Sequence, residues 1–559
     1  MKKRIVTFGA AFCLAAGLLA GCGFTGGGDS AQPAAPSGTA AGQTSAGETA
    51  APSASADSRV LSIYASAEIK TLVQWDASDS QSSMVNNNAF EGLLRLDANH
   101  EAQPALAESY EVSDDKLTYT FHLRDGLQWS NGTPLTADDF VFSWLKQMSP
   151  DATNGYGFIM TDYIVGGEEY NEGTAKAEDV GVKALDAKTL QVTLKAPTPY
   201  FARLTVLCQF FPLNEEWVNS QGDQYGLSAD KMIYCGPYVI TSYDPAVGAT
   251  LKKNDKYWDA ANVKVENAQV RVMKDASAAL NAYLAGELSQ VKLDSSNVAA
   301  YKDSPEFSSE SEFRTEYLQF SLTNPVMANK NIRRAVSMAI DRDTLARAIL
   351  ADGSAPSVGL IAEGMYGNGD QTFRELNGNL SPFDPEQAKK YWEEGCKELG
   401  ETPTLTLLVR DDSVTKAEAT YIQSELNKNL GIDIVIDTKT LQARNALMDN
   451  DSFMFASTAW GADYDDAMTY LDLWTNGTPY RGSYQNEEYN KLITDARTET
   501  DETKRLDMLL QAEKILVEDD VIVAPLFHRG SATLTKPDVK GIVNHPFGPD
   551  VEFKYAYFE

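Results

Sequence analysis

The chain has 559 residues, which is more than one hydrophobic core normally serves, so we expect several lobes. Hydrophobic residues make up 43% of it and charged residues 23%, which excludes a disordered chain, a collagen and a membrane protein with many spans. Lysine and arginine total 48 against 79 aspartates and glutamates, a formal net charge of −31. Such an acidic surface repels nucleic-acid phosphates and anionic lipid, so neither is expected as a partner.

The N-terminal segment is typical of a secretory signal. Basic residues at positions 2–4 precede an apolar run over 5–20 that is too short for a comfortable membrane span. The run ends in Leu-Ala-Gly-Cys, which resembles a bacterial lipobox. The resemblance implies that residues 1–21 are removed as a lipoprotein signal peptide and that Cys22 carries a diacylglycerol on its sulfur. The alternative is an ordinary signal peptide with an incidental cysteine.

The segment that follows, residues 22–58, is composed mainly of Gly, Ala, Ser, Thr and Pro and contains no Lys or Arg. It buries too little apolar surface to offset the entropy of ordering, so we expect a disordered tether. A lipid at its start would anchor the protein to the outer face of the cell membrane.

Three cysteines lie beyond this tether, at Cys208, Cys235 and Cys396. An odd number in an exported protein allows one disulfide and one free thiol, and Cys208 and Cys235 are the nearer pair. Three independent buried thiols are an equally open alternative.

Helix and strand patterns alternate from about residue 60 to the C-terminus, which predicts an α/β protein. Thr136 and Asp139 have the spacing of a capping box and predict the start of a helix that continues to Met148. Apolar residues at helical spacing over 332–340 predict a second amphipathic helix.

A βαβ unit is predicted in the second half of the chain. Residues 405–409 have the pattern of a buried strand, a helical pattern follows over 414–430, and Gly431 marks its end. Residues 432–436 then predict a second strand, parallel to the first.

The C-terminal region contains three further predicted elements. Residues 453–460 form an apolar, strand-like run that opens into the acidic segment 461–466. A helix is predicted over 502–518 and a strand over 521–527.

Three segments resemble the family 5 extracellular solute-binding proteins of ABC importers, and in particular the lipid-anchored oligopeptide-binding proteins of Gram-positive bacteria. They are Pro-Ala-Leu-Ala-Glu-Ser-Tyr at 104–110, Tyr-Thr-Phe-His-Leu-Arg-Asp-Gly at 119–126 and Trp-Ser-Asn-Gly-Thr-Pro-Leu-Thr-Ala-Asp-Asp-Phe at 129–140. These are mostly turn and core positions, so they indicate the family strongly and its ligand weakly.

The resemblance implies an α/β fold of the type II periplasmic-binding-protein kind, with two lobes, an extra domain and a cleft that closes about a hinge. The implied ranges are 59–90, 216–314 and 527–559 for lobe one, 91–215 for the extra domain, and 315–526 for lobe two.

The segment after the strand at 453–460 carries the predicted ligand site. A carboxylate at the end of a strand in an α/β sheet is well placed to meet a ligand in a crevice. The resemblance implies that Asp463 pairs with the α-ammonium group of a bound peptide. It also implies that the neighbouring residues line the cleft, namely Trp460, Gly461, Ala462 and Tyr464.

Other interpretations of this segment remain open. Asp463 could cap the following helix, with Asp465 and Asp466 as surface charges that favour the helix N-terminus. The order of these acids does not match an EF-hand loop, so no metal site is predicted. Tyr156 is a candidate for the cleft and, equally, for the core.

The resemblance also raises the question of which basic residue would bind the C-terminal carboxylate of a peptide. In some relatives an arginine lies a few residues before the tryptophan, but here 456–459 reads Ala-Ser-Thr-Ala. Arg410 and Arg444 are candidate substitutes. This departure argues against strict dipeptide specificity.

The predicted function is that of a monomeric, extracellular substrate-binding lipoprotein, without a cofactor, that captures oligopeptides and delivers them to the permease subunits of an ABC transporter. The alternatives are a receptor for a nickel chelate or haem, and a peptide-sensing surface protein. A secreted hydrolase is disfavoured, because the chain contains neither Gly-x-Ser-x-Gly nor His-Glu-x-x-His and its four histidines lie far apart.

Overall fold

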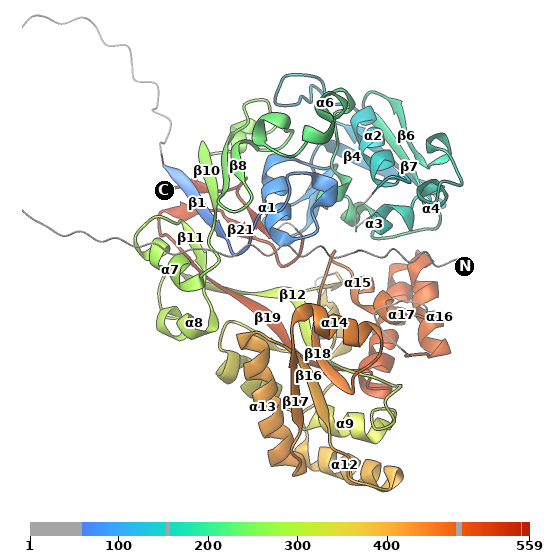
Figure 1. The fold of residues 1–559 in the computed structure, drawn as a ribbon. Helices are drawn as coiled ribbons and strands as arrows, with labels where there is room; N and C mark the ends of the chain where they lie inside the picture. The colour runs from blue at the N-terminus through green and yellow to red at the C-terminus, as the bar shows by residue number, and fades with distance from the viewer. Residues whose placement is uncertain (1–58, 153–156, 370, 477–482, 549) are drawn as a thin grey trace, which may run out of the picture. The chain divides into compact units, whose positions relative to one another are not determined.

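The computed structural model describes residues 59–559 except 153–156, 370, 477–482 and 549 (Figure 1). The predictions for the signal segment, Cys22, the tether and Tyr156 therefore fall outside the described residues. Within the described part of the chain, no helix is both long enough and apolar enough to cross a membrane.

The first sheet has four strands in the order β1-β10-β9-β8, in which β1 is parallel to β10 and the other pairs are antiparallel. Helix α1 contacts β8, and the Asp79 side chain begins this helix by accepting a hydrogen bond from the Ser82 amide at 3.0 Å. The elements are β1 (Val60–Ala65), α1 (Ser80–Ala89), β8 (Tyr238–Asp244), β9 (Gly248–Lys253) and β10 (Asn267–Val272).

The second sheet is antiparallel, in the order β4-β5-β7-β6, and α2 packs against β6 and β7. The predicted capping interaction is confirmed, because the Asp139 carboxylate accepts a hydrogen bond from the Thr136 amide at 2.8 Å. Phe140 and Trp144 are fully buried on the inner side of this helix. The elements are β4 (Ala107–Val112), β5 (Thr118–Leu123), α2 (Ala137–Gln147), β6 (Val182–Asp186) and β7 (Thr189–Thr193).

The third sheet has seven strands, and its two long central strands, β12 and β19, run antiparallel to each other. Its order is β11-β19-β12-β18-β16-β17, with β13 also paired to β19. The strands are β11 (Gln290–Lys292), β12 (Phe307–Phe320), β13 (Ala355–Pro356), β16 (Thr406–Arg410), β17 (Val435–Lys439), β18 (Phe455–Gly461) and β19 (Val523–Thr535).

The predicted βαβ unit is confirmed: β16 and β17 are parallel and are joined by α13 (Ser413–Leu430). Gly431, with φ of +73°, ends this helix in the left-handed conformation that glycine tolerates best. The second strand begins at Val435, later than predicted, because the buried Ile432 and Ile434 belong to the connection that precedes it.

Strand β16 is buried on both faces, which explains its continuous apolar sequence. Leu407 and Val409 pack into the core on the side of α13, whereas Leu408 packs on the opposite side against Met448 of α14 (Leu441–Asp449).

The remaining predicted helices are also present. The 332–340 pattern corresponds to α9 (Lys330–Met338), and the 502–518 pattern to α17 (Glu502–Lys514) with the π-helical turn Ile515–Asp519. The other helices of seven or more residues are α6 (Glu215–Gln221), α7 (Ala276–Leu284), α8 (Ser295–Tyr301), α12 (Pro385–Leu399) and α16 (Glu487–Thr498).

Strand β19 is longer than the apolar run that predicted it. Its second half pairs with the first half of β12, from Phe307 opposite Leu534 to Ser311 opposite Gly530. This half carries polar side chains such as Thr533, so it gives no continuous hydrophobic signal.

The cysteines of the described residues are all free thiols. Cys208 Sγ lies 3.9 Å from Ser83 Oγ, and the Cys235 thiol donates to the carbonyl of Glu91 at 3.7 Å. The described cysteines therefore form no disulfide, and of the three thiols expected to be buried in that alternative, Cys208 and Cys235 are buried whereas Cys396 is partly exposed.

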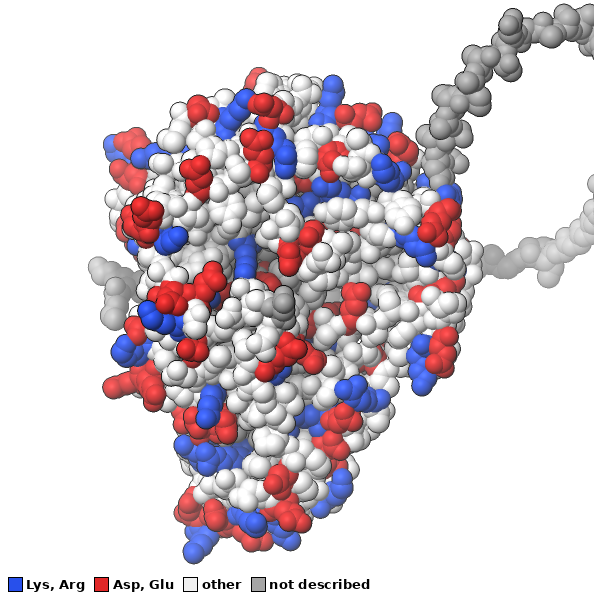
Figure 2. All heavy atoms as spheres, turned by 180° about the vertical axis from the view of Figure 1, so that it is seen from behind, with Lys and Arg blue, Asp and Glu red and all other residues white. Residues whose placement is uncertain are grey.

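The described residues belong to one compact unit. The residue ranges predicted for the two lobes and the extra domain stay predictions. Charged side chains of both signs are interspersed over the face in Figure 2, without a large patch of one sign.

Candidate ligand-binding site

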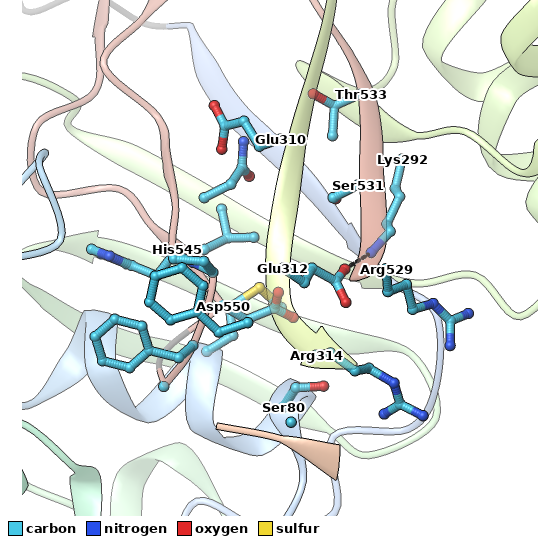
Figure 3. A pocket seen from close by; sticks show the side chains of 18 of the residues that line it. Ser80, Lys292, Glu310, Glu312, Arg314, Arg529, Ser531, Thr533, His545 and Asp550 are labelled. Atoms are coloured by element: carbon cyan, nitrogen blue, oxygen red, sulfur yellow. Dashed lines mark hydrogen bonds and ion pairs between the residues drawn. The ribbon is translucent and has the colours of Figure 1, made fainter. Parts of the chain in front are cut away.

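A cavity of about 570 Å³, which we call the large cavity, lies along the first half of β12. Residues 307–312 of this half are exposed or partly buried, and most of their side chains are polar. Figure 3 shows acidic, basic and hydroxyl side chains facing this space. The lining residues from the third sheet are Gln290, Lys292, 310–314, Gly461, Arg529, Ser531 and Thr533, and those from elsewhere include Ala462, Tyr64, Ser80, Met84 and residues 544–548.

A second cavity of about 170 Å³, the small cavity, adjoins the first. Ser80, Ala462 and Gly548 line both, so the two spaces meet at these residues. One wall of the small cavity is the segment 206–209, and Asp463 also lines it. A ligand that follows the chain direction of β18 could therefore reach from one cavity into the other.

Asp463 lies two residues beyond β18, and its backbone is held in place. The Ala462 amide donates to the carbonyl of Phe313 at 2.7 Å, and the Asp463 amide donates to Thr469 Oγ1 at 3.2 Å. The Asp463 carboxylate, in contrast, makes no hydrogen bond or ion pair with any described residue, and burial raises its pKa from 3.8 to about 6. A desolvated carboxylate without a partner favours a cationic ligand group.

The helix-cap interpretation of Asp463 is wrong. The next helix, α15 (Met468–Leu471), has its Met468 amide bonded at 3.0 Å to the carboxylate of Asp466.

The prediction that Asp465 and Asp466 are surface charges is also wrong. Asp466 is buried and forms a bidentate ion pair with Arg505, with both N–O distances 2.8 Å. Asp465 Oδ1 accepts a hydrogen bond from the Tyr366 amide at 2.9 Å. Both partners lie far away in sequence, so the run of acids alone could not reveal them.

The two aromatic residues of the predicted site lie away from both cavities. Trp460 of β18 lies opposite Thr315 of the neighbouring strand β12 and is partly buried against the core. Tyr464 is buried and stacks on Tyr200, with ring centroids 5.1 Å apart and planes 4° apart. The cavity wall in this segment is formed instead by Gly461, Ala462 and Asp463.

Comparison with known proteins identifies the family. Residues 101–482 match the profile of bacterial extracellular solute-binding proteins, family 5 Middle. The chain belongs to this family of solute-binding proteins. The resemblance drawn from the segments within 104–140 is thereby confirmed.

Individual relatives of this solute-binding protein agree with the assignment. It is 30% identical over 580 residues to the oligopeptide-binding protein OppA of Bacillus subtilis, with 100% of both chains covered. It is 31% identical over 477 residues to the dipeptide-binding protein DppE of the same species, covering 84% of this chain and 86% of the relative. The structure of Listeria monocytogenes OppA bound to peptide matches with a TM-score of 0.73 and 34% identity, covering 89% of this chain and 99% of that one. The predicted α/β fold of the periplasmic-binding-protein type is therefore confirmed.

The arginines proposed from the sequence of this solute-binding protein line neither cavity. Arg410 Nε lies 2.9 Å from the carboxylate of Asp412. Arg444 is buried, and its Nη1 donates to the carbonyl of Ser457 at 2.8 Å, so it supports β18 from α14.

The basic side chains among the described lining residues of the large cavity are Lys292, Arg314 and Arg529. Lys292 pairs with Glu312, as Figure 3 shows. Arg314 Nε and Arg529 Nη1 lie 3.1 Å and 3.8 Å from the same Glu316 oxygen. The sequence analysis did not propose these three basic residues, because they come from three separate strands. One usable signal was the charge at every second position of 310–314, which is typical of a strand with a polar face.

Two of the four histidines meet at the edge of the large cavity. His100 Nδ1 lies 3.1 Å from His545 Nδ1, and His545 Nε2 lies 3.1 Å from the buried Glu552 carboxylate. Burial and the neighbouring imidazole lower the pKa of His100. No group of three or more His, Cys, Asp or Glu side chains in the described chain is arranged to hold a metal ion.

Proposed function

We propose that this solute-binding protein captures oligopeptides outside the cytoplasmic membrane and delivers them to the permease subunits of an ABC transporter. The observation that carries the proposal is the unpaired, desolvated carboxylate of Asp463 beside the junction of the two cavities. The names of its relatives, which include an oligopeptide-binding and a dipeptide-binding protein, support a peptide ligand.

The peptide's α-ammonium group is the natural partner for this carboxylate. An ammonium group enclosed in a protein is strongly disfavoured unless it meets an ionised partner. Asp463 supplies that partner, and the small cavity offers no basic side chain among its described lining residues that would compete for it.

The charges of the two cavities also suggest the direction of the bound chain. The charged residues that line the small cavity are Asp79 and Asp463. The large cavity is lined by the acids Glu310, Glu312 and Asp550, and also by cations that the small cavity lacks, namely Lys292, Arg314 and Arg529. The N-terminus would therefore lie at the small cavity, and the C-terminal carboxylate or an acidic side chain would lie in the large one.

Closure of two lobes around the peptide is part of the proposal. Strands β12 and β19 run through the proposed lobe boundaries at 314/315 and 526/527, and they would act as adjacent hinge strands. A bound ligand that contacts both lobes favours the closed state. Small-angle scattering should then give a smaller radius of gyration with peptide than without it, and an unchanged radius at saturation would contradict closure.

Membrane attachment through a lipid on Cys22 completes the proposal and rests on the lipobox and the polar tether. The Cys22→Ser variant should be released from membranes or remain as unprocessed precursor. Unchanged anchorage of that variant would contradict the lipoprotein assignment.

The ligand class can be tested without prior choice of a peptide. Native mass spectrometry of the purified protein should detect copurified masses that fragment as peptides. A metal-chelate or porphyrin mass instead would favour the alternative of a non-peptide solute.

A further inference from the structure

We propose that Arg203 and Tyr200, which line neither the large nor the small cavity, are positioning residues for ligand binding because they hold residues 463–466 in place. We call residues 463–466 the Asp463 turn. The inference rests on the proposed pairing of Asp463 with a peptide amine, and it names residues that act on this pairing from outside the site.

The Asp463 turn is fixed by its neighbours and not by the Asp463 side chain, whose carboxylate has no partner among the described residues. The next residue, Tyr464, stacks on Tyr200 at 5.1 Å. Arg203 Nη1 then donates to the carbonyl of Asp465 at 2.7 Å. The orientation of the free carboxylate therefore depends on contacts made one and two residues further along the chain.

Arg203 occupies its position through more than one contact. Its guanidinium lies over the ring of Tyr366 at 4.5 Å, and the Tyr366 amide donates to Asp465 Oδ1 at 2.9 Å. Arg203 thus bonds the backbone of Asp465, and Tyr366 bonds its side chain. A charged donor on a carbonyl oxygen is one of the stronger hydrogen bonds in proteins.

Tyr200 is held on a second side. The guanidinium of Arg505 lies 5.2 Å from the centre of its ring, and the same guanidinium forms the bidentate pair with Asp466. The stack of Tyr200 on Tyr464 is therefore tied to the far end of the Asp463 turn as well.

Arg203 and Tyr200 lie directly before a segment of the chain that lines the small cavity. Arg203 lies in α5 (Phe201–Leu204) and is 262 residues away from Asp465 in sequence. The chain continues from α5 into residues 206–209, which form the wall of the small cavity that Asp463 also lines. One segment therefore both forms a wall of the site and fixes the turn that carries the carboxylate, so a displacement of α5 would change the space available to the amine.

A purely structural role for Arg203 and Tyr200 makes a different prediction from a positioning role. Loss of general stability would weaken all ligands equally. Loss of position at Asp463 would weaken ligands with a free amine and leave N-acetylated ligands nearly unaffected, because only the free amine uses the carboxylate.

The experiment uses the full-length protein with an equimolar library of tri- to pentapeptides and its N-acetylated counterpart. Equilibrium dialysis with mass-spectrometric detection gives the retention of each. Arg203→Gln should weaken retention of the free-amine library by about three- to thirtyfold, the range expected for residues that act on a site through others. Retention of the acetylated library should change by less than about twofold.

Conservative variants serve as rescue controls. Arg203→Lys keeps a cationic donor and should restore most of the affinity, and Tyr200→Phe keeps the stacked ring and should behave like the wild type. Tyr200→Leu removes the ring and should reproduce the effect of Arg203→Gln.

Arg334 provides a matched control elsewhere in the molecule. Its Nη2 donates to the carbonyl of Asp519 at 3.2 Å, and its guanidinium lies 5.5 Å from the ring centre of Tyr391, but it lines neither cavity. Arg334→Gln should leave the retention of both libraries unchanged.

The outcomes separate this inference from the proposed function. If the wild type retains free and acetylated libraries equally, the pairing of Asp463 with an amine is wrong, and the positioning role is overturned with it. If the wild type prefers free amines but Arg203→Gln keeps that preference in full, or weakens both libraries equally, only the positioning role is overturned.

Discussion

Arg505 and Asp466 form a buried bidentate ion pair in which Nη1 and Nη2 of the arginine each lie 2.8 Å from a carboxylate oxygen. Three residues earlier, the carboxylate of Asp463 has no partner among the described residues. Two aspartates of one short turn thus differ in their environment: the Asp466 carboxylate is paired with an arginine, whereas the Asp463 carboxylate is unpaired among the described residues.

Removal of the charge on Asp466 should destabilise the protein. Asp466→Asn leaves the Arg505 guanidinium buried without its counter-ion, which typically costs about 3–5 kcal/mol of unfolding free energy. Urea unfolding at neutral pH measures this loss. A loss below about 1 kcal/mol would show that the pair is less important than its geometry indicates.

The pH dependence of this pair has a definite sign. Burial alone raises the pKa of Asp466, but the Arg505 guanidinium outweighs burial and holds this pKa below its usual value of 3.8. The stabilisation is therefore complete above about pH 4 and is lost as the pH falls through the lower, folded-state pKa. The difference between the wild type and Asp466→Asn should shrink correspondingly in acid.

Replacement of Asp463 should have the opposite effect on the ligand-free protein. Burial raises its folded-state pKa from 3.8 to about 6, so ionisation of this group lowers stability as the pH rises from about 4 to 6. Asp463→Asn removes this effect and should stabilise the ligand-free protein by about 1–3 kcal/mol at pH 7.5. The gain should fade at pH 4, where the wild-type carboxyl is protonated in the folded state. A variant that is less stable than the wild type at pH 7.5 would indicate a structural partner for Asp463.

Much of the fold could be predicted because the signals were local. The βαβ unit around α13 was visible from two apolar runs and Gly431, and α2 was visible from Thr136 and Asp139. The position of Asp463 after a buried strand followed from its neighbours and from the family resemblance.

The remaining features depend on contacts between distant residues. Only the strand order β11-β19-β12 brings Lys292, Arg529 and Arg314 to one cavity, and no local pattern specifies that order. The pairing of Asp466 with Arg505 spans 39 residues, so adjacent acids looked like surface charges. Arg410 illustrates the converse, since a charge after a strand was a reasonable site residue until its pairing with Asp412 was seen.

The cations of the large cavity should matter for the peptide's C-terminus, and Arg410 should not. Arg529→Gln is expected to weaken binding of peptides with a free C-terminal carboxylate more than binding of their C-terminal amides, because it removes a cavity-lining charge. Arg410→Gln should change neither affinity by more than about twofold, since its side chain is engaged outside the cavity. Equilibrium dialysis of matched acid and amide peptide libraries compares the two variants directly. An equal response of acids and amides to Arg529→Gln would contradict the proposed direction of the bound chain.

The most direct test of the account is calorimetric titration of a peptide identified from the copurified ligands, in free and N-acetylated form, into the wild type and Asp463→Asn. At pH 7.5 the free peptide should bind the variant about a hundredfold or more weakly than it binds the wild type, because a buried charge pair is broken. The acetylated peptide should bind both proteins with similar, low affinity. At pH 5 the wild-type preference for the free amine should fall about tenfold, because a carboxyl with a pKa of about 6 is then mostly protonated. If Asp463→Asn instead weakens the free and acetylated peptides equally, or weakens neither, the amine is held elsewhere and the central claim is wrong.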